Sequence, residues 1–276
     1  MCQDCGCSLG PQSQRAKQPA ATQGKPRTEV IEVITAILSE NDRTAAHNRS
    51  HFDSQQVLAL NLMSSPGAGK TSLLESTIHA LGGELRIGVI EGDLATENDA
   101  ERIRACGVPA VQITTGNACH LDAAMVHDAV HELKLADLDV LFIENVGNLV
   151  CPASFDLGQH RNITLLSVPE GDDKPAKYPV MFRAADLALI TKCDLLAYIE
   201  EFKPQRARDA LERIGFDGAI LELSSRGGPG FDTWLSWLKE EILSHRQRAA
   251  KGRTLAPRIQ PEGAMLHSAA DFPLSR

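Results

Sequence analysis

The stretch that decides the fold is Ser64-Ser65-Pro66-Gly67-Ala68-Gly69-Lys70-Thr71. It follows an apolar run typical of a strand, at 57–63, and precedes a helical pattern over 71–81. It matches the phosphate-binding loop G-x-x-x-x-G-K-S/T, except that Ser64 stands where the first glycine is expected. Glycines in such a loop let backbone N–H groups face phosphate oxygens, and the following helix N-terminus favours an anion. The stretch therefore predicts a phosphate-binding site at a strand-to-helix junction.

The residue types in this loop suit separate parts of a nucleotide. The Lys70 ammonium can reach the β- and γ-phosphates, and the Thr71 hydroxyl can hold Mg²⁺. The predicted phosphate-binding residues are Gly67, Ala68, Gly69, Lys70, Thr71 and Ser72.

Apolar runs alternate with helical patterns along most of the chain. After the first run at 57–63, further strands are expected at 86–91, 110–114, 140–144, 163–168, 187–191 and 219–223. Helical patterns are found at 71–81, 97–106, 121–134, 205–214 and 231–243. The strand runs are nearly continuous in Val, Ile and Leu, as expected when both faces of a sheet are buried. We therefore predict an α/β P-loop NTPase fold, with a mainly parallel sheet of about seven strands flanked by helices.

The composition divides the chain into three segments. Residues 1–27 combine cysteines with Gln, Pro, Ala, Lys and Ser, which predicts a metal-binding motif on a flexible tether. Residues 28–244 form the predicted G domain, including an N-terminal helix that starts near Thr28. Residues 245–276 lose the apolar pattern and are expected to be a disordered tail.

The bulk composition excludes several classes of partner. The chain has 276 residues, 43% of them hydrophobic, and a formal net charge of −8. This charge disfavours nucleic acid or an anionic membrane, since either would attract a basic surface. The sequence has neither an apolar run near the ~20 residues that span a bilayer nor a secretory signal, so we expect a cytoplasmic protein. Cysteines in that reducing compartment favour metal or redox chemistry over structural disulfides.

Two acidic segments end predicted strands in the order that a GTPase requires. Asp93 closes Glu91-Gly92-Asp93, where it could coordinate Mg²⁺ or orient the attacking water. In Glu144-Asn145-Val146-Gly147, the Gly147 N–H could meet the γ-phosphate and Glu144 could contact Mg²⁺. The predicted catalytic residues are Lys70, Asp93 and Gly147, and the predicted Mg²⁺ ligands are Thr71, Asp93 and Glu144.

Two later segments predict that the base is guanine. Thr191-Lys192-Cys193-Asp194 resembles N-K-x-D, in which the Asp194 carboxylate can accept from N1–H and the exocyclic amine of guanine. Lys192 can lie over the base, and Ser224, Ser225 and Arg226 resemble the loop that completes a guanine pocket. Thr191 replaces the usual Asn, which leaves the bracing of this loop open.

Cysteines and one histidine form two candidate metal sites. Cys2, Cys5 and Cys7, here called the terminal cysteines, can wrap one soft or borderline divalent ion. Cys119, His120 and Cys151, the internal set, follow predicted strand ends and suit Zn²⁺ or Ni²⁺. The alternative is that the internal cysteines are unrelated buried residues. The other histidines, His47 and His51 among them, show no ligand spacing and are expected at the surface.

Several of these stretches together resemble one known family. They are M-C-Q-D-C-G-C at 1–7, S-S-P-G-A-G-K-T at 64–71, E-G-D at 91–93, C-H-L-D at 119–122, E-N-V-G-N-L-V-C-P at 144–152 and K-Y-P-V at 177–180. They are similar to the HypB family, the nickel-inserting GTPases of nickel–iron hydrogenase maturation. The resemblance covers roughly residues 28–243 and the first seven residues.

The resemblance implies a SIMIBI-class GTPase that dimerises across its nucleotides and turns over slowly. It also implies a tight nickel site at the terminal cysteines and a weaker nickel or zinc site at the internal set. The expected partners are the zinc- and nickel-binding maturation protein HypA and, through it, a hydrogenase large subunit. Two departures matter: the chain has no histidine-rich storage stretch, and Ala124 stands where some relatives have a histidine. We therefore expect one internal ion, shared across a dimer.

Three alternatives remain at this stage. A urease accessory GTPase has the same fold and metal, but it reads C-P-H where this chain has Cys151-Pro152-Ala153. An ATP-dependent small-molecule kinase is disfavoured by Asp194 and the 224–226 loop. A metal carrier with an inactive nucleotide site is disfavoured by intact Lys70, Thr71 and Asp93.

Overall fold

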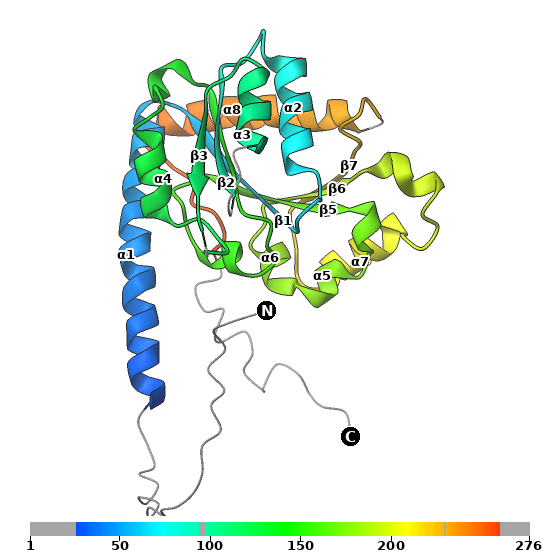
Figure 1. The fold of residues 1–276 in the computed structure, drawn as a ribbon, viewed down its shortest axis with the longest axis horizontal. Coiled ribbons are helices and arrows are strands. Elements are labelled where there is room, and N and C mark those ends of the chain that lie inside the picture. Colours follow the sequence, from blue (N-terminus) through cyan, green and yellow to red (C-terminus); the bar gives the residue numbers. More distant parts are fainter. Residues whose placement is uncertain (1–25, 94–97, 117, 229, 260–276) are drawn as a thin grey trace, which may run out of the picture.

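The computed structural model describes residues 26–93, 98–116, 118–228 and 230–259. A central sheet lies between two layers of helices, and the long helix α1 stands along one side of the molecule (Figure 1). The strands are β1 Leu58–Ser64, β2 Ile87–Asp93, β3 Ala110–Thr114, β4 Val140–Glu144, β5 Arg161–Ser167, β6 Leu187–Thr191 and β7 Ala219–Glu222. They form one seven-stranded sheet in the order β3-β2-β4-β1-β5-β6-β7, and every pair is parallel. The predicted α/β fold is confirmed.

Helices follow the strands as the alternation predicts. The α-helices are α1 Pro26–Ser54, α2 Lys70–Leu81, α3 Asn98–Ala105, α4 Ala123–Val130, α5 Lys174–Lys177, α6 Pro179–Arg183, α7 Pro204–Arg213 and α8 Phe231–Ala249. Short 3₁₀ helices are η1 Leu135–Asp137, η2 Cys151–Ser154, η3 Val168–Glu170 and η4 Cys193–Ala197. The helix expected to end at 243 therefore continues to Ala249. Its extension is held by polar contacts, with Arg246 paired to Asp139 and Arg248 to Glu241.

The core lies on both faces of the sheet. Alternate residues of β1 point to opposite sides, as the period of a strand requires. Leu60 and Leu62 pack with apolar residues of α2 and α8, among them the fully buried Trp234. Ala59 packs on the other side with Phe52 of α1 and with residues of α4. Because both faces are covered, strand ends are where the sheet can present polar side chains.

The second half of α1 is held to the domain by buried polar side chains. Arg49 Nη2 lies 2.6 and 2.7 Å from the two carboxylate oxygens of Asp156. Asn48 Nδ2 donates to the Ala123 carbonyl at 2.8 Å and to the Leu157 carbonyl at 3.1 Å. These bonds fix α1 against the start of α4.

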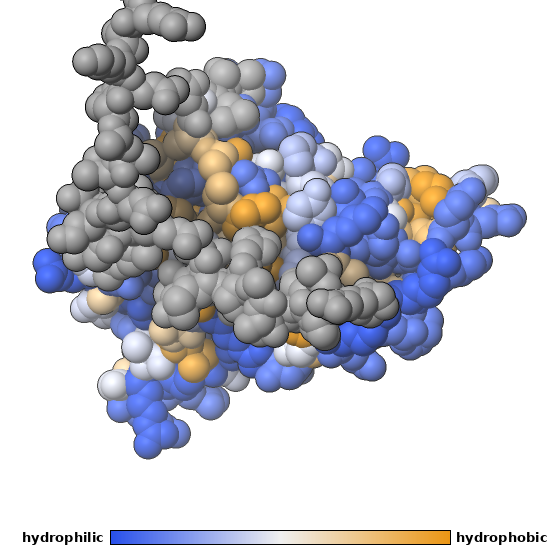
Figure 2. Space-filling view, turned by 90° about the horizontal axis from the view of Figure 1, so that it is seen from below, coloured by the Kyte–Doolittle hydropathy of each residue, from blue (hydrophilic) through white to orange (hydrophobic). Residues whose placement is uncertain are grey.

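One face of the molecule carries mainly hydrophilic residues where it is described (Figure 2). Seen from below the view of Figure 1, hydrophobic areas are small and interrupted by hydrophilic ones (Figure 2). Among the described residues, no helix combines the length and apolar character needed to cross a membrane.

Candidate functional site

A cavity of about 580 Å³ opens at the carboxyl ends of β1, β2, β4 and β6. It is lined by every residue that the sequence predicts for the nucleotide: Gly67, Ala68, Gly69, Lys70, Thr71, Ser72, Asp93, Glu144, Gly147, Lys192, Asp194, Ser224, Ser225 and Arg226. These residues come from segments far apart in the chain. The parallel sheet brings them together because its strands all end at the same edge.

The phosphate-binding loop has the backbone that its glycines permit. Gly67 and Gly69 have φ of 75° and 99°, in the left-handed region, and α2 begins directly after Gly69. The Lys70 ammonium donates to Ser64 Oγ at 3.2 Å. The serine that replaces the first glycine of the motif therefore orients Lys70, the lysine predicted to bind phosphate.

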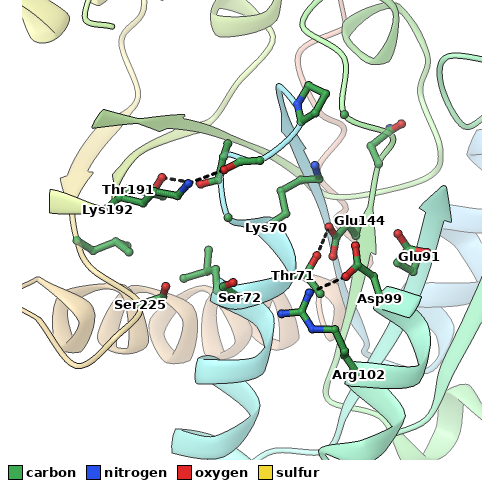
Figure 3. A pocket seen from close by; sticks show the side chains of 18 of the residues that line it. Lys70, Thr71, Ser72, Glu91, Asp99, Arg102, Glu144, Thr191, Lys192 and Ser225 are labelled. Atoms are coloured by element: carbon green, nitrogen blue, oxygen red, sulfur yellow. Dashed lines mark hydrogen bonds and ion pairs between the residues drawn. The ribbon is translucent and has the colours of Figure 1, made fainter. Parts of the chain in front are cut away.

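Carboxylates gather at one end of the cavity (Figure 3). The β2–β4 register places Glu91 directly beside Glu144, and the Thr71 hydroxyl donates to Glu144 Oε1 at 2.9 Å. Oxygens of Glu91, Asp99 and Glu144 lie within 4.8 Å of one another. Asp93 lines the same cavity at the end of β2, outside this group of three.

Burial makes these carboxylates costly to ionise. Desolvation, followed by the charge of Glu144, raises the pKa of Glu91 to about 8. Desolvation also raises the pKa of Glu144 to about 7. One buried oxygen of each side chain, Oε2, has no hydrogen-bond partner among the described residues. A divalent cation would offset both penalties, and oxygen donors are the ligands that Mg²⁺ prefers, so this donor set fits Mg²⁺.

Three residues at this end were missed by the sequence reasoning: Glu91, which was given no role beside Asp93, and two residues of α3. Asp99 and Arg102 of α3 line the cavity and pair with each other at 2.7 Å, and Arg102 also pairs with Glu75 of α2 at 2.7 Å. Their spacing along a helix that follows Glu91-Gly92-Asp93 was the available signal. It was weak, because such i, i+3 pairs are common on solvated helix faces.

The opposite end of the cavity holds the predicted base-reading residues. Ser224 Oγ donates to Asp194 Oδ1 at 2.7 Å, which joins the two segments of the expected guanine pocket. Lys192 Nζ donates to the Gly67 carbonyl at 2.7 Å, and Thr191 Oγ1 donates to the Ala68 carbonyl at 2.8 Å. Figure 3 shows Thr191 and Lys192 across the loop from the carboxylates. The threonine hydroxyl therefore braces the phosphate-binding loop, which answers the question left open by the missing Asn.

The internal set is brought together at the same edge of the sheet. The sulfurs of Cys119 and Cys151 are 3.0 Å apart, and His120 Nδ1 lies 3.6 Å from Cys119 Sγ. His120 stacks on Phe155 with 3.9 Å between ring centroids. Burial, with the neighbouring Cys119 thiol, raises the pKa of Cys151 to about 11. A divalent ion would stabilise the Cys151 thiolate that burial disfavours, and sulfur and imidazole donors suit both metals, so the donor set fits nickel or zinc. The terminal cysteines lie outside the described residues.

Direct contacts connect the internal set to the phosphate-binding loop. A Cβ added at Gly147 would lie 2.9 Å from Pro66, so this backbone touches the loop. Asn145 Oδ1 accepts from the N–H groups of Val146 at 3.0 Å and of Leu121 at 3.2 Å. Leu121 directly follows His120, so one amide side chain bonds to both segments that carry the internal set.

The expectation that the remaining histidines are surface residues is wrong for His160 and His245 but holds for the exposed His47. His160 and His245 are fully buried. His47 and His51 of α1 lie against His127 of α4, with ring centroids 5.3 and 6.3 Å away. Sequence spacing could not show this, because the pairing depends on how α1 packs on α4.

Known proteins similar to this chain agree with the geometry. The model of the CobW/HypB/UreG nucleotide-binding domain matches residues 58–214. The hydrogenase maturation factor HypB of Azotobacter chroococcum mcd 1 is 45% identical over 254 residues, 92% of this chain and 80% of that protein. The hydrogenase/urease maturation factor HypB of Helicobacter hepaticus is 51% identical over 188 residues, 67% of this chain and 76% of that protein. The crystal structure of HypB from Helicobacter pylori in complex with nickel has a TM-score of 0.72 and 41% identity, covering 75% of this chain and 97% of that one. The chain therefore belongs to the HypB family of hydrogenase maturation factors.

Proposed function

We propose that this protein binds and hydrolyses GTP and uses that cycle to hold nickel and release it during hydrogenase maturation. The observation that carries the proposal is the contact of Gly147 with Pro66 of the phosphate-binding loop, four residues before Cys151. If the Gly147 segment shifts when the γ-phosphate leaves, it would also shift Cys151, a predicted metal ligand. Support for the metal comes from the Helicobacter pylori relative, which was crystallised with nickel.

Guanine is the base that the cavity suits. Asp194 presents a carboxylate, which can accept from both N1–H and the exocyclic amine of guanine, and adenine lacks that donor pair. Ser224 holds this carboxylate in place at 2.7 Å. GTP should therefore bind better than ATP, which also separates this function from that of an ATP-dependent kinase.

Hydrolysis would rest on charge stabilisation at the phosphates. Lys70 is placed to neutralise the β- and γ-phosphates, and Mg²⁺ would be held by Thr71, Glu144 and Asp93. The Gly147 N–H would meet the γ-phosphate, and Asp93 would bind the ion or orient water. Because the buried carboxylates of Glu91 and Glu144 lie side by side, an Mg²⁺ ion that arrives with the nucleotide would reduce their repulsion, so metal and nucleotide should bind cooperatively.

Two metal-binding sites are predicted. The terminal cysteines would hold nickel tightly, and the internal set would hold one nickel or zinc ion more weakly, shared between two chains of a GTP-bound dimer. HypA is the expected recipient or donor, and a hydrogenase large subunit is the final destination.

The test is nickel affinity of the internal set in two nucleotide states. In a full-length variant with the terminal cysteines changed to serine, we expect the nickel Kd with GDP to differ at least fivefold from the Kd with a non-hydrolysable GTP analogue. Equal affinities would contradict the coupling. Adding Lys70→Ala should abolish nucleotide binding and make the nickel Kd independent of nucleotide. Adding Lys177→Ala, at an exposed residue that does not line the cavity, should leave the difference intact.

Urease maturation is the second candidate. It is favoured by the Helicobacter hepaticus relative, which is a hydrogenase/urease maturation factor. Nickel transfer to an apo-urease and to an apo-hydrogenase, measured side by side, distinguishes the two. We expect activation of the hydrogenase.

A further inference from the structure

Four histidines from two helices gather on one side of the molecule. His47 and His51 lie one turn apart on α1, with ring centroids 4.4 Å apart. His127 and His131 are spaced in the same way, from α4 into the turn that follows it, with centroids 4.6 Å apart. The pairs meet because α1 packs along α4 (Figure 1), which leaves His47 and His127 5.3 Å apart.

The ring nitrogens of the second pair are arranged as metal ligands are. Asn48 donates both its amide bonds to carbonyls, so its Oδ1 accepts from His127 Nδ1 at 2.9 Å. This bond leaves the lone pair of His127 on Nε2, and metal-bound histidines are typically oriented by such a partner on the other nitrogen. Nε2 of His127 lies 3.1 Å from Nε2 of His131. Two nitrogens at about 2.1 Å from one ion are about 3.0 to 3.4 Å apart, depending on whether it is octahedral or tetrahedral.

Electrostatics also favour a cation bound to neutral imidazoles here. Burial, followed by the charges of His131 and His47, lowers the pKa of His127. Protonating several of these rings together would be opposed by their mutual repulsion. Several neutral imidazole rings can instead bind one divalent ion through their lone pairs, which avoids placing a proton on each ring.

We propose that His127 and His131 form a third metal site, which binds a divalent transition ion such as Ni²⁺ or Zn²⁺ through imidazole nitrogens. His47 and His51 of α1 join it once their rings turn, since no three of the four rings have nitrogens within 4.8 Å of one another in the structure. Imidazole suits both ions. His47 and His131 are exposed, so the ion is reached from solvent and exchanges readily, unlike one in a closed structural site. None of the four histidines lines the nucleotide cavity or belongs to the internal set, so the site is distinct from both.

The test removes every thiol ligand and then the histidines. The parent is full-length protein without an affinity tag, carrying serine at positions 2, 5, 7, 119 and 151. Equilibrium dialysis against Ni²⁺, and separately Zn²⁺, should show one bound ion per chain. X-ray absorption should show a nitrogen and oxygen shell without sulfur. Changing both His47→Gln and His131→Gln, at exposed positions, should weaken binding at least about tenfold. The matched control, His79→Gln, changes an exposed helical histidine outside the cluster and should bind as the parent does.

A second readout separates a bound ion from a folding defect. An ion that bridges α1 and α4 should raise the midpoint of thermal unfolding of the parent on adding Zn²⁺. The doubly substituted variant should unfold as the parent does in a chelator and show no rise with Zn²⁺. The proposal is overturned if the parent binds no ion, or if the double substitution leaves affinity and the Zn²⁺-induced rise unchanged. The 3.1 Å Nε2 separation would then be an ordinary hydrogen bond between two imidazoles.

Discussion

Gly147 packs so closely against the phosphate-binding loop that a single added carbon would disturb it. An ideal Cβ there lies 2.9 Å from Pro66 Cα, Cγ and N, and two of these atoms are backbone. Overpacking of this kind costs about 1–3 kcal/mol. We expect Gly147→Ala to weaken GTP binding about tenfold, measured by titration with a fluorescent GTP analogue. Gly83→Ala, where an added Cβ meets nothing within 4 Å, is the control and should bind normally. An unchanged GTP affinity in Gly147→Ala would show that the phosphate-binding loop can shift to accommodate the added Cβ without loss of binding.

Thr191 shows what a motif can and cannot predict about one residue. The sequence placed Lys192 and Asp194 correctly at the cavity, because a motif specifies which atoms must face a ligand. It could not say what replaces the missing Asn. The answer depends on a carbonyl at Ala68, 2.8 Å from Thr191 Oγ1 and distant in sequence. A shorter side chain with a hydroxyl reaches it.

At the scale of elements, the strands were the most predictable part. The bounds of β3, β4 and β6 agree with the sequence reading, because β4 and β6 are fully buried runs and β3 is bounded by turns. The end of α8 was not predictable. Its last turns hold the buried His245 and two arginines, whose partners Asp139 and Glu241 are known only once the chain has folded. The four-histidine cluster and Arg102 were missed for the same reason.

One buried ion pair contributes to the attachment of α1. Arg49 and Asp156 have side chains only 9% and 13% exposed, so removing the arginine leaves a buried carboxylate without its partner. We expect Arg49→Ala to lower the free energy of unfolding by about 3–5 kcal/mol, measured by urea denaturation. Arg43→Ala breaks a pair with Glu40 whose side chains are 79% and 75% exposed. That control should change stability by less than about 1 kcal/mol. Equal effects of the two substitutions would contradict a special role for Arg49.

At the scale of the whole molecule, the two edges of the sheet carry different kinds of buried titratable group. The carboxyl edge carries the nucleotide cavity and the internal set, where buried Glu91, Glu144 and Cys151 are left with raised pKa values. The amino edge carries His160, which directly precedes β5, and His245 of α8 packs against it with 4.2 Å between ring centroids. The buried histidines at the second edge have lowered pKa values, so they make folding less favourable as the pH falls.

His245 makes that dependence testable. Burial, the charge of His160 and to a smaller extent Arg248 lower its pKa to about 4, outweighing Asp53 and Glu241, which raise it. Both ring nitrogens lack hydrogen-bond partners among the described residues, so the charged form, with two N–H groups to satisfy, is disfavoured. A histidine in the unfolded chain has a pKa near 6.5. Below that pH, the unfolded chain therefore binds a proton at His245 that the folded chain does not bind. The contribution of His245 to the free energy of unfolding is therefore fully present above about pH 6.5, and it is lost as the pH falls toward 4.

Replacing His245 with leucine should flatten this part of the pH profile. Between pH 7 and pH 5, the linkage predicts that the wild-type protein loses about 2 kcal/mol more unfolding free energy than His245→Leu. Other residues also contribute to the pH dependence: His160 has a lowered pKa, and Glu91 and Glu144 have raised pKa values that act in the opposite direction. These contributions are present in both proteins, so they cancel in the difference. Urea denaturation in a chelator at both pH values measures the difference, and His79→Leu at an exposed site should follow the wild type. Parallel profiles for wild type and His245→Leu would mean that the folded protein accommodates a charged His245, so its burial would not make folding depend on pH.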